Sequence, residues 1–507
     1  MKRKTGGIGH TQQENSWPQD EMNKAAVQKE RAFFRTNPPV CHLQITVNAH
    51  RICILPYTYQ YFYQISKLSQ KVTTFAEQNK TGNKVGIGMR VLIINTSERI
   101  GGAAIAANRL MEALKDNGIK AKMLVRDKQT EQMTVVSIGG SWMLPAKFIW
   151  ERIVIFIANR LKKNNLFQVD IANTGTDITS MPEFEQADVI HLHWVNQGFI
   201  SLSDIEKIVL SGKPVVITMH DMWYFTGICH YSGTCDKYRN ECNHCPLLTK
   251  GGFGKDLASK VFKRKMRIYS EAKITFIGCS RWISGLAEQG RLTNGQVVMN
   301  IPNAINTNVF HPKDKTEARR ACGLPEDKML LLFGAQRITD ERKGFQYMVD
   351  ACNLIKENYP ELAERIGLVV VGGDSEKVRS RIPFPVYPVS YVSDESYMVN
   401  LYNAVNIYVT PSLQDNLPNT IVEAMSCGVP CVGFNVGGIP EMIDHLHNGY
   451  VAEYRNAEDF ANGIRWTLDG SNYDSLCDIA RRKAVSTYSE SHVARLYTEV
   501  YNKIIHK

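Results

Sequence analysis

Two carboxylates, Asp415 and Glu423, flank the start of a predicted helix and are the residues best placed for chemistry. An apolar strand should end at Thr410, and Pro418–Thr420 should open the helix. The free backbone N–H groups of a helix start favour an anion such as a diphosphate. Glu423, in the first turns, can accept hydrogen bonds from ribose hydroxyls, and Asp415, on the loop, from the hydroxyls of a sugar. This spacing predicts a site for a sugar nucleotide.

Two cations follow an earlier predicted strand and begin another helix. Arg337 can bind phosphate oxygens through two parallel hydrogen bonds, whereas Lys343 acts as a point charge. Arg342 is interpreted as a solvated neighbour. Gly372 ends a further apolar run, where a glycine permits close approach to a nucleotide. Taken alone, the basic pair would indicate surface charge, but beside the acidic pair it favours a diphosphate site.

The first half of the chain carries glycines and histidines at predicted strand ends. Gly101 and Gly102 form a strand-to-helix turn whose amides can approach a phosphate or a sugar, although a plain tight turn explains them too. His220 follows a strand and is expected near the reacting centre, with Asp221 fixing its imidazole or the loop. His193 ends the preceding strand and is expected on the acceptor side. His191 is expected to be a core histidine that points away from His193.

From Met89 onward, apolar runs alternate with helical patterns, which predicts an α/β fold with doubly wound parallel sheets. Because the alternation restarts near Met329, we expect two Rossmann-like domains facing a cleft. The predicted strands are 90–95, 189–193, 215–219, 274–279, 329–334, 368–371, 407–410 and 431–434, and the clearest predicted helices are 104–117 and 345–358. The predicted divisions are an atypical extension at 1–88, an N-terminal domain at 89–300, a C-terminal donor domain at 301–485, and a helix at 486–507 that crosses back to the first domain.

The stretch 411–441 resembles glycosyltransferase family 4. It contains two acidic residues separated by seven others, followed by Glu-Ala-Met-x-x-Gly-x-Pro and Gly-Gly-x-Pro-Glu. Asp415 stands where the family usually has Glu, which shortens the reach to the sugar by one methylene. The resemblance covers residues 89–507 and implies a retaining GT-B fold. It implies catalytic roles for His220, Arg337, Lys343 and Asp415, and donor binding by Gly101, Gly102, Gly372, Asn416, Leu417, Pro418, Asn419, Thr420 and Glu423.

The resemblance also implies an activity, that of a hexosyltransferase-type enzyme using a nucleotide-sugar donor. The block 220–246 is similar to a subgroup from exopolysaccharide clusters of the colanic-acid type, which implies a lipid-linked surface-polysaccharide acceptor, as in capsule or O-antigen synthesis. No Asp-x-Asp motif occurs at a suitable strand end, so we expect no metal cofactor in catalysis, with cations and helix dipoles neutralising the diphosphate. A sugar-nucleotide epimerase and a catalytically silent sugar-nucleotide-binding subunit remain the alternatives.

Four of the twelve cysteines fall within the loop at 223–247, namely Cys229, Cys235, Cys242 and Cys245. A loop with little apolar mass can be organised by a tetrahedral zinc-thiolate site. Free thiols and a redox pair explain the same spacing equally well. The sequence therefore leaves a structural zinc site open beside these alternatives.

The formal net charge of +10 does not favour nucleic acid, because residues 1–88 hold +7 of it and no reading element is visible. No secretory signal or membrane span is apparent, so we expect a cytoplasmic protein. Peripheral contact with the inner leaflet of the cytoplasmic membrane stays open. Residues 147–163 predict a helix with a wide apolar face, more often packed on its own sheet than on a membrane. Met89 is our expected natural start, with an accessory segment at 1–88 as the alternative.

Overall fold

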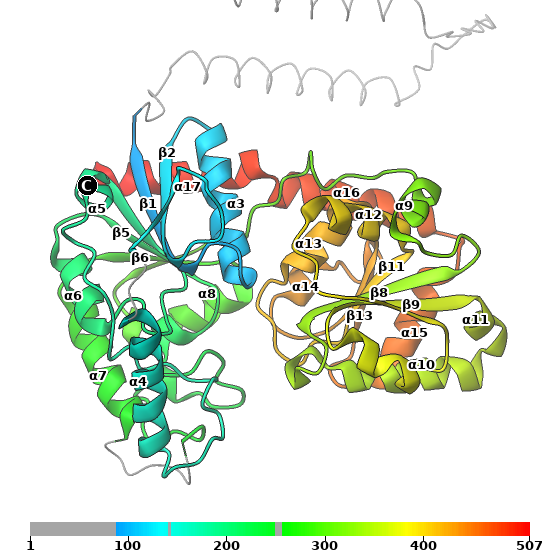
Figure 1. The fold of residues 1–507 in the computed structure, drawn as a ribbon, viewed down its shortest axis with the longest axis horizontal. Helices are drawn as coiled ribbons and strands as arrows, with labels where there is room; N and C mark the ends of the chain where they lie inside the picture. The colour runs from blue at the N-terminus through cyan, green and yellow to red at the C-terminus, as the bar shows by residue number, and fades with distance from the viewer. Residues whose placement is uncertain (1–87, 140–142, 249–255, 507) are drawn as a thin grey trace, which may run out of the picture. The chain divides into compact units, whose positions relative to one another are not determined.

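The computed structural model describes residues 88–139, 143–248 and 256–506. The chain separates into two units, 1–83 and 84–507, and the first lies outside the described residues. The expectations for the extension at 1–88 and for a start at Met89 are therefore not tested by the structure. Figure 1 shows the described elements in chain order.

The first sheet consists of seven strands, all paired in parallel, in the order β3-β2-β1-β4-β5-β6-β7. Its strands are β1 (Arg90–Ser97), β2 (Lys120–Asp127), β3 (Val135–Ser137), β4 (Val189–Leu192), β5 (Val215–Met219), β6 (Ile274–Gly278) and β7 (Val297–Asn300). The order reverses at β1, so the loops after β1 and β4 diverge at the point where open parallel sheets bind ligands.

The second sheet has six strands, also all parallel, in the order β10-β9-β8-β11-β12-β13. They are β8 (Met329–Arg337), β9 (Ile366–Gly373), β10 (Val386–Val389), β11 (Ile407–Thr410), β12 (Cys431–Phe434) and β13 (Gly449–Ala452). Its order reverses between β8 and β11, whose loops carry Lys343 and Asp415. Each of the eight strands predicted from apolar runs is present in one of the two sheets.

Helices connect the strands and cover both sheets. They are α3 (Gly102–Asp116), α4 (Met143–Ala158), α5 (Pro182–Gln186), α6 (Leu202–Leu210), α7 (Leu257–Ser270), α8 (Arg281–Glu288), α9 (Lys315–Cys322), α10 (Phe345–Asn358), α11 (Pro360–Arg365), α12 (Glu395–Ala404), α13 (Asn419–Ser426), α14 (Ile439–Met442), α15 (Ala457–Leu468), α16 (Tyr473–Tyr488) and α17 (Glu490–Ile505). Short 3-10 turns are η1 (Trp223–Phe225), η2 (Lys237–Arg239), η3 (Arg291–Thr293), η4 (Glu341–Lys343) and η5 (Ser375–Arg381). Among the described residues, no helix combines the length and apolarity needed to span a bilayer.

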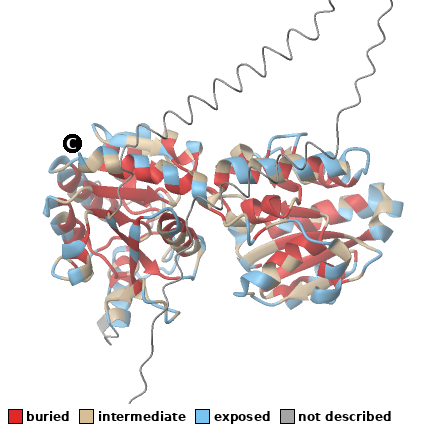
Figure 2. Ribbon diagram, turned by 90° about the horizontal axis from the view of Figure 1, so that it is seen from above, coloured by how far each residue is buried: buried red, intermediate tan, exposed pale blue. Residues whose placement is uncertain are grey.

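Apolar clusters fill the space on both faces of each sheet. Strands covered on both faces read as continuous apolar runs, which is why β1, β6 and β9 were visible in the sequence. Figure 2 shows the strands of both sheets in the buried colour, with exposed residues on the outer faces of the helices. The α/β fold with two doubly wound parallel sheets is as predicted.

The final helix, α17, packs against α3 and against the core of the first sheet. Two of its tyrosines form hydrogen bonds to polar side chains in that core. The Tyr497 hydroxyl lies 2.9 Å from Thr218 Oγ1, and the Tyr501 hydroxyl lies 2.8 Å from His191 Nδ1. The chain thus returns to its first sheet after completing the second.

Candidate active site

A tight turn after β8 positions Lys343 beside Asp415. Gly344 has φ 68°, and a Cβ there would lie 1.8 Å from the Pro411 carbonyl oxygen, so only glycine fits. The Leu413 amide donates to the Arg342 carbonyl oxygen at 2.7 Å, which joins the two loops. As a result Lys343 Nζ lies 2.6 Å from Asp415 Oδ2. Two residues predicted from separate motifs therefore form one ion pair.

A glycine turn after β12 supports the loop that carries Asp415. Gly437 has φ 59°, and a Cβ on it would lie 1.7 Å from the Asp415 carbonyl oxygen. A Cβ on Gly438 would lie 2.1 Å from the Asn416 carbonyl oxygen, and the Gly438 amide donates to that oxygen at 2.8 Å. The Gly-Gly part of the sequence motif is thus required by close backbone packing beneath the site.

Glu423, on the first turns of α13, is buried and has a partner on each carboxylate oxygen. Arg109 from α3 lies 2.9 Å from Oε1, and the Tyr402 hydroxyl donates to Oε2 at 2.7 Å. Arg109 also contacts Glu395 at 3.1 Å. Each carboxylate oxygen retains a second lone pair, so these partners still leave acceptor capacity for a ligand hydroxyl.

Asparagines at the start of α13 join the ends of strands from both sheets. Buried Asn416 donates through Nδ2 to the His220 carbonyl oxygen at 3.0 Å and accepts from the Ser280 hydroxyl. Asn419 donates to the Gly102 carbonyl oxygen at 3.0 Å. These contacts bring the predicted donor loop together with His220 and with the glycine turn of the first sheet.

Beyond β4 and β5 lie His193, which is buried, and His220, which is half-buried. His193 Nδ1 and His220 Nε2 share a hydrogen bond of 2.9 Å, and His193 Nε2 has no partner among the described residues. Burial lowers the pKa of His220 to about 4, against the opposing effect of Asp221. It lowers the pKa of His193 well below its ordinary value as well. Both rings are therefore neutral near pH 7.

One expectation about the histidine region needs correction, and the two alternatives for Asp221 are resolved in favour of the loop. Residues two apart on a strand share a face, so His191 does not point away from His193, and their ring centroids lie 4.3 Å apart. Asp221 makes no hydrogen bond to the His220 ring. It accepts from the Trp223 amide at 2.9 Å and lies 2.7 Å from His230 Nδ1, so it stabilises the loop instead.

The remaining predicted residues lie outside the ion pair of Lys343 and Asp415. Arg337 is exposed at the end of β8, and Gly101, with φ 95°, precedes α3. Gly372 is explained by packing, because its Cβ would lie 1.8 Å from the Ala335 carbonyl oxygen. Thr420 accepts from the Tyr408 hydroxyl at 2.8 Å. Leu417 packs in the core of the second sheet, so its backbone alone is available to a donor.

Comparisons with known proteins agree with this geometry. A family model described as glycosyl transferases group 1 matches residues 327–470, which contain Lys343, Asp415 and Glu423. N-acetyl-alpha-D-glucosaminyl L-malate synthase of Bacillus anthracis is 23% identical over 217 residues, covering 41% of this chain and 54% of that protein. Over residues 327–470 the chain is therefore similar to the group 1 glycosyltransferases.

Solved structures share the fold of this chain. Sucrose-phosphate synthase from Thermosynechococcus elongatus has a TM-score of 0.57 at 18% identity, covering 82% of this chain and 99% of that one. Anabaena HepE, solved in complex with UDP-glucose, has a TM-score of 0.54 at 14% identity, covering 82% of this chain and 100% of that one. The predicted family 4 resemblance and GT-B fold class are confirmed.

This chain matches the first curated relatives over only part of their own length. The chain matches 54% of the first and 44% of the second, so it spans about half of the curated relatives it matches. The match to the family model is likewise confined to residues 327–470, which hold Lys343, Asp415 and Glu423.

Sequence reasoning missed several residues that surround the candidate site. Arg109 and Tyr402 hold Glu423, and Glu441 accepts the Arg281 and Trp282 amides at 2.8 and 2.6 Å. Arg109 left one signal, an arginine on the buried side of an Ala- and Leu-rich helix. Tyr402 left none, because a tyrosine on an amphipathic helix is ordinary core.

The buried histidines predict a loss of stability in acid. His191 lies between Thr218 and Tyr501, and burial lowers its pKa to about 3. Below about pH 6.5 the unfolded chain binds a proton here that the folded chain does not, so stability falls as the pH falls through this window. We expect one such histidine to cost about 2 kcal/mol at pH 5 relative to pH 7. Urea unfolding at both pH values measures it.

His191→Gln should lower this pH dependence, since glutamine cannot be protonated. His506→Gln, at an exposed position just after α17, is the matched control and should leave the pH dependence of stability unchanged. Equal pH dependence in wild type and His191→Gln would contradict the assignment of a neutral, buried ring.

Proposed function

We propose that this protein is a retaining glycosyltransferase that moves a sugar from a nucleoside-diphosphate donor to a lipid-linked surface-polysaccharide precursor. The ion pair between Lys343 and Asp415, next to the start of α13 and to Glu423, is the observation that carries the proposal. It supplies a cation for a diphosphate and carboxylates for two sets of hydroxyls within one loop cluster. HepE, with the same fold, binds UDP-glucose, which supports a nucleotide-sugar donor here.

The proposed donor lies with its diphosphate against Lys343, Arg337 and the amides of α13. Cations and a helix start stabilise the negative charge that grows on the diphosphate as it departs. Glu423 accepts hydrogen bonds from the ribose, and Asp415 from the transferred sugar. Neutral His220 donates to or accepts from a hydroxyl of that sugar near the reacting carbon.

The proposed reaction needs no nucleophile from the protein. The acceptor oxygen forms a bond to the anomeric carbon on the face from which the diphosphate leaves, while the bond from that carbon to the phosphate oxygen breaks. The acceptor proton passes to the departing phosphate oxygen. The products are the glycosylated acceptor, with its anomeric configuration retained, and a nucleoside diphosphate.

A thermal-shift screen with UDP-, GDP- and ADP-sugars tests donor binding, because a bound donor raises Tm by mass action. Glycosyl transfer to a membrane extract and NMR of the product linkage then test the reaction. Turnover should persist in EDTA and gain nothing from added magnesium. An altered sugar nucleotide formed without acceptor would favour the epimerase, and donor binding without turnover would favour the silent subunit.

Helix α4 gives a reason to place the acceptor on a membrane. One face of the helix is anchored to the first domain, because Glu151 accepts the Ile171 and Ala172 amides at 2.8 and 2.7 Å and Arg152 pairs with Asp170. The opposite face exposes apolar side chains on and just after the helix, namely Ile149, Trp150, Ile153, Ile157, Leu161 and Phe167.

The charge beside this apolar face favours an anionic surface. Lys162 and Lys163 follow the helix and are exposed. Exposed apolar residues beside lysines are typical of helices that lie in the interface of an anionic bilayer. The proposed enzyme thus works against the leaflet in which a lipid-linked acceptor resides.

Membrane binding should depend on the exposed face of α4. Trp150 and Ile157 are 54% and 61% exposed, so Trp150→Glu/Ile157→Glu is expected to reduce co-sedimentation with anionic vesicles by about tenfold or more. Met133→Glu, at a residue 91% exposed and away from α4, is the matched control. Unchanged sedimentation of the double variant, or equal loss in the control, would contradict membrane docking through α4.

A further inference from the structure

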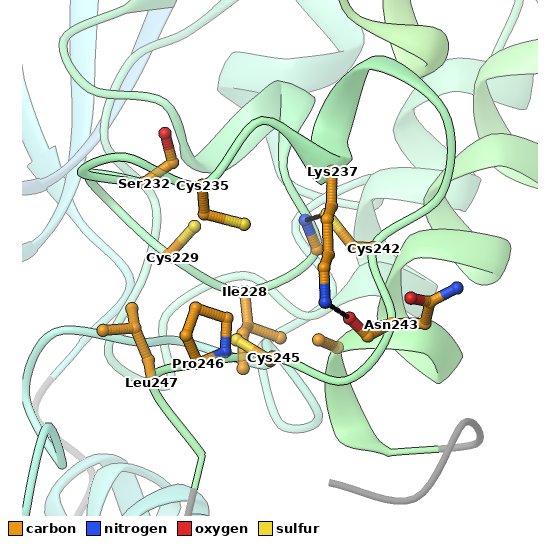
Figure 3. A pocket seen from close by; sticks show the side chains of 12 residues that line it. Ile228, Cys229, Ser232, Cys235, Lys237, Cys242, Asn243, Cys245, Pro246 and Leu247 are labelled. Atoms are coloured by element: carbon orange, nitrogen blue, oxygen red, sulfur yellow. Dashed lines mark hydrogen bonds between the residues drawn. The ribbon is translucent and has the colours of Figure 1, made fainter. Parts of the chain in front are cut away.

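The segment that follows β5 has little regular structure, yet residues 222–229 are buried, and most of those after them are half-buried or exposed. Between residues 220 and 248 the only helical turns are η1 and η2. Cys229, Cys235, Cys242 and Cys245 all line one cavity of about 20 Å³ in this segment. A space of this size admits one small occupant, such as a single ion or water. Figure 3 shows the four side chains around it, with Cys229 and Cys235 pointing toward one another.

We propose that Cys229, Cys235, Cys242 and Cys245 bind one structural zinc ion as four thiolates. Four sulfur ligands in a tetrahedron are the usual set for structural zinc, and Cys242-x-x-Cys245 has the spacing of a paired ligand turn. Binding converts four thiols and Zn²⁺ into a complex of net charge −2 and releases four protons. The proposal concerns the stability of this segment and does not rest on the proposed reaction.

A backbone amide is already directed at one of the sulfurs, because the Gly227 amide donates to Cys242 Sγ at 3.3 Å. The Leu248 amide donates to the Cys245 carbonyl oxygen at 3.1 Å, which fixes the backbone of that cysteine. Hydrogen bonds from amides to sulfur stabilise a thiolate and are the outer contacts that orient a metal ligand.

A buried lysine close to the cavity has no directly paired carboxylate. Lys265 is fully buried, its Nζ donates to the carbonyl oxygens of Trp223 and Thr226, and it lies 3.5 Å from the centre of the Trp223 ring. Within the described residues, no carboxylate forms an ion pair with it. Cys229 and Cys242 are near enough to interact with its charge, as are the carboxylates of Asp221 and Asp170 at longer range.

A tetrathiolate zinc complex places a further anion near this lysine. A buried ammonium without a direct ion pair is costly, and a nearby charge of −2 reduces that cost. The four-cysteine cavity and Lys265 are separate observations, because the lysine comes from α7 and the cysteines from the preceding loop. Both are consistent with one bound ion.

The sulfur atoms must turn inward to meet the ion. Among residues 88–139, 143–248 and 256–506, no three His, Cys, Asp or Glu side chains already stand around a metal position. The same four cysteines are all free of disulfide bonds. Rotation of the side chains into the cavity is therefore the one change that the proposal requires.

Metal analysis of the full-length protein, purified without chelator, tests the proposal directly. We expect about one zinc per chain after gel filtration, released in step with titration of the thiols by an organomercurial. Cys235→Ser and Cys242→Ser should lose the zinc, whereas Cys352→Ser, at a buried cysteine of α10, should retain it. Zinc well below one equivalent with four free thiols, or a Cys229–Cys235 disulfide by mass spectrometry, would overturn the proposal.

Two further measurements apply even if the serine variants do not fold. Wild-type protein reconstituted with cobalt(II) should show the intense visible bands of a tetrahedral tetrathiolate site, and their absence would count against it. Lys265→Met should weaken zinc binding about 10- to 100-fold in competition with a chromogenic chelator. If Lys265→Met bound zinc as tightly as wild type, the argument from the charge of Lys265 would be wrong. This measurement does not depend on the activity of the enzyme.

Discussion

Replacing Lys343 with alanine is expected to lower kcat by about 10²–10³-fold, because the departing diphosphate loses a cation aimed at its growing charge. The side chain is 29% exposed and its partner Asp415 is 15% exposed, so removal leaves a mostly buried carboxylate without its cation. Tm should therefore fall as well. Steady-state kinetics with the donor identified by thermal shift, together with thermal unfolding, measure both effects.

Matched variants separate this role from general surface charge. Lys343→Arg keeps the cation but alters its reach and should recover part of the lost kcat. Lys377→Ala removes an exposed lysine that pairs with Asp374 and should leave kcat unchanged. If Lys343→Ala retained kcat within about threefold of wild type, the diphosphate would have to be held elsewhere.

Glu423→Gln is expected to weaken donor binding by about 10- to 100-fold, since hydrogen bonds to a charged acceptor contribute about 1.5–3 kcal/mol. Glutamine keeps the size of the side chain but lacks the charge that accepts ribose hydroxyls. The donor Kd from thermal-shift or calorimetric titration measures the loss. We expect kcat at saturating donor to change less than the Kd, because the ribose lies away from the reacting carbon.

Arg109 provides the control for this second prediction. Arg109→Met removes the same 2.9 Å ion pair from the opposite side and leaves the Glu423 carboxylate in place. We expect it to weaken donor binding less than Glu423→Gln, although both variants lose the contact between α3 and α13. Equal losses of donor affinity would mean that Glu423 acts through its pairing with Arg109 and not through the ribose.

The second sheet was predictable because its signals are local. Lys343 and Asp415 each follow a strand with a continuous apolar sequence, and parallel strands end at one edge of a sheet. The glycines at 344, 437 and 438 are required by backbone contacts within a few Å, so their positions in the sequence already marked the turns. The placement of His193 and His220 followed from the same rule about strand ends.

Contacts between distant segments were not predictable. Arg109 and Glu423 are 314 positions apart, and Lys265 reaches a loop some forty residues earlier, so no spacing rule connects them. The direction of His191 was misjudged by a local argument about strand alternation. The sequence could show that α4 is apolar on a wide face but not whether another part of the chain covers it.

By itself, the sequence determined the α/β class, the two parallel sheets, the resemblance to glycosyltransferase family 4 and the charged loops at the ends of β8 and β11. These features depend on residues close together along the chain, where periodicity, helix starts and glycine turns act. Only the tertiary structure decided which partners hold Glu423, that Asp221 serves the loop and not His220, and that Lys265 lies buried beside four cysteines. Those outcomes depend on packing between segments far apart in sequence, because burial and charge pairing are set only when the whole chain has folded.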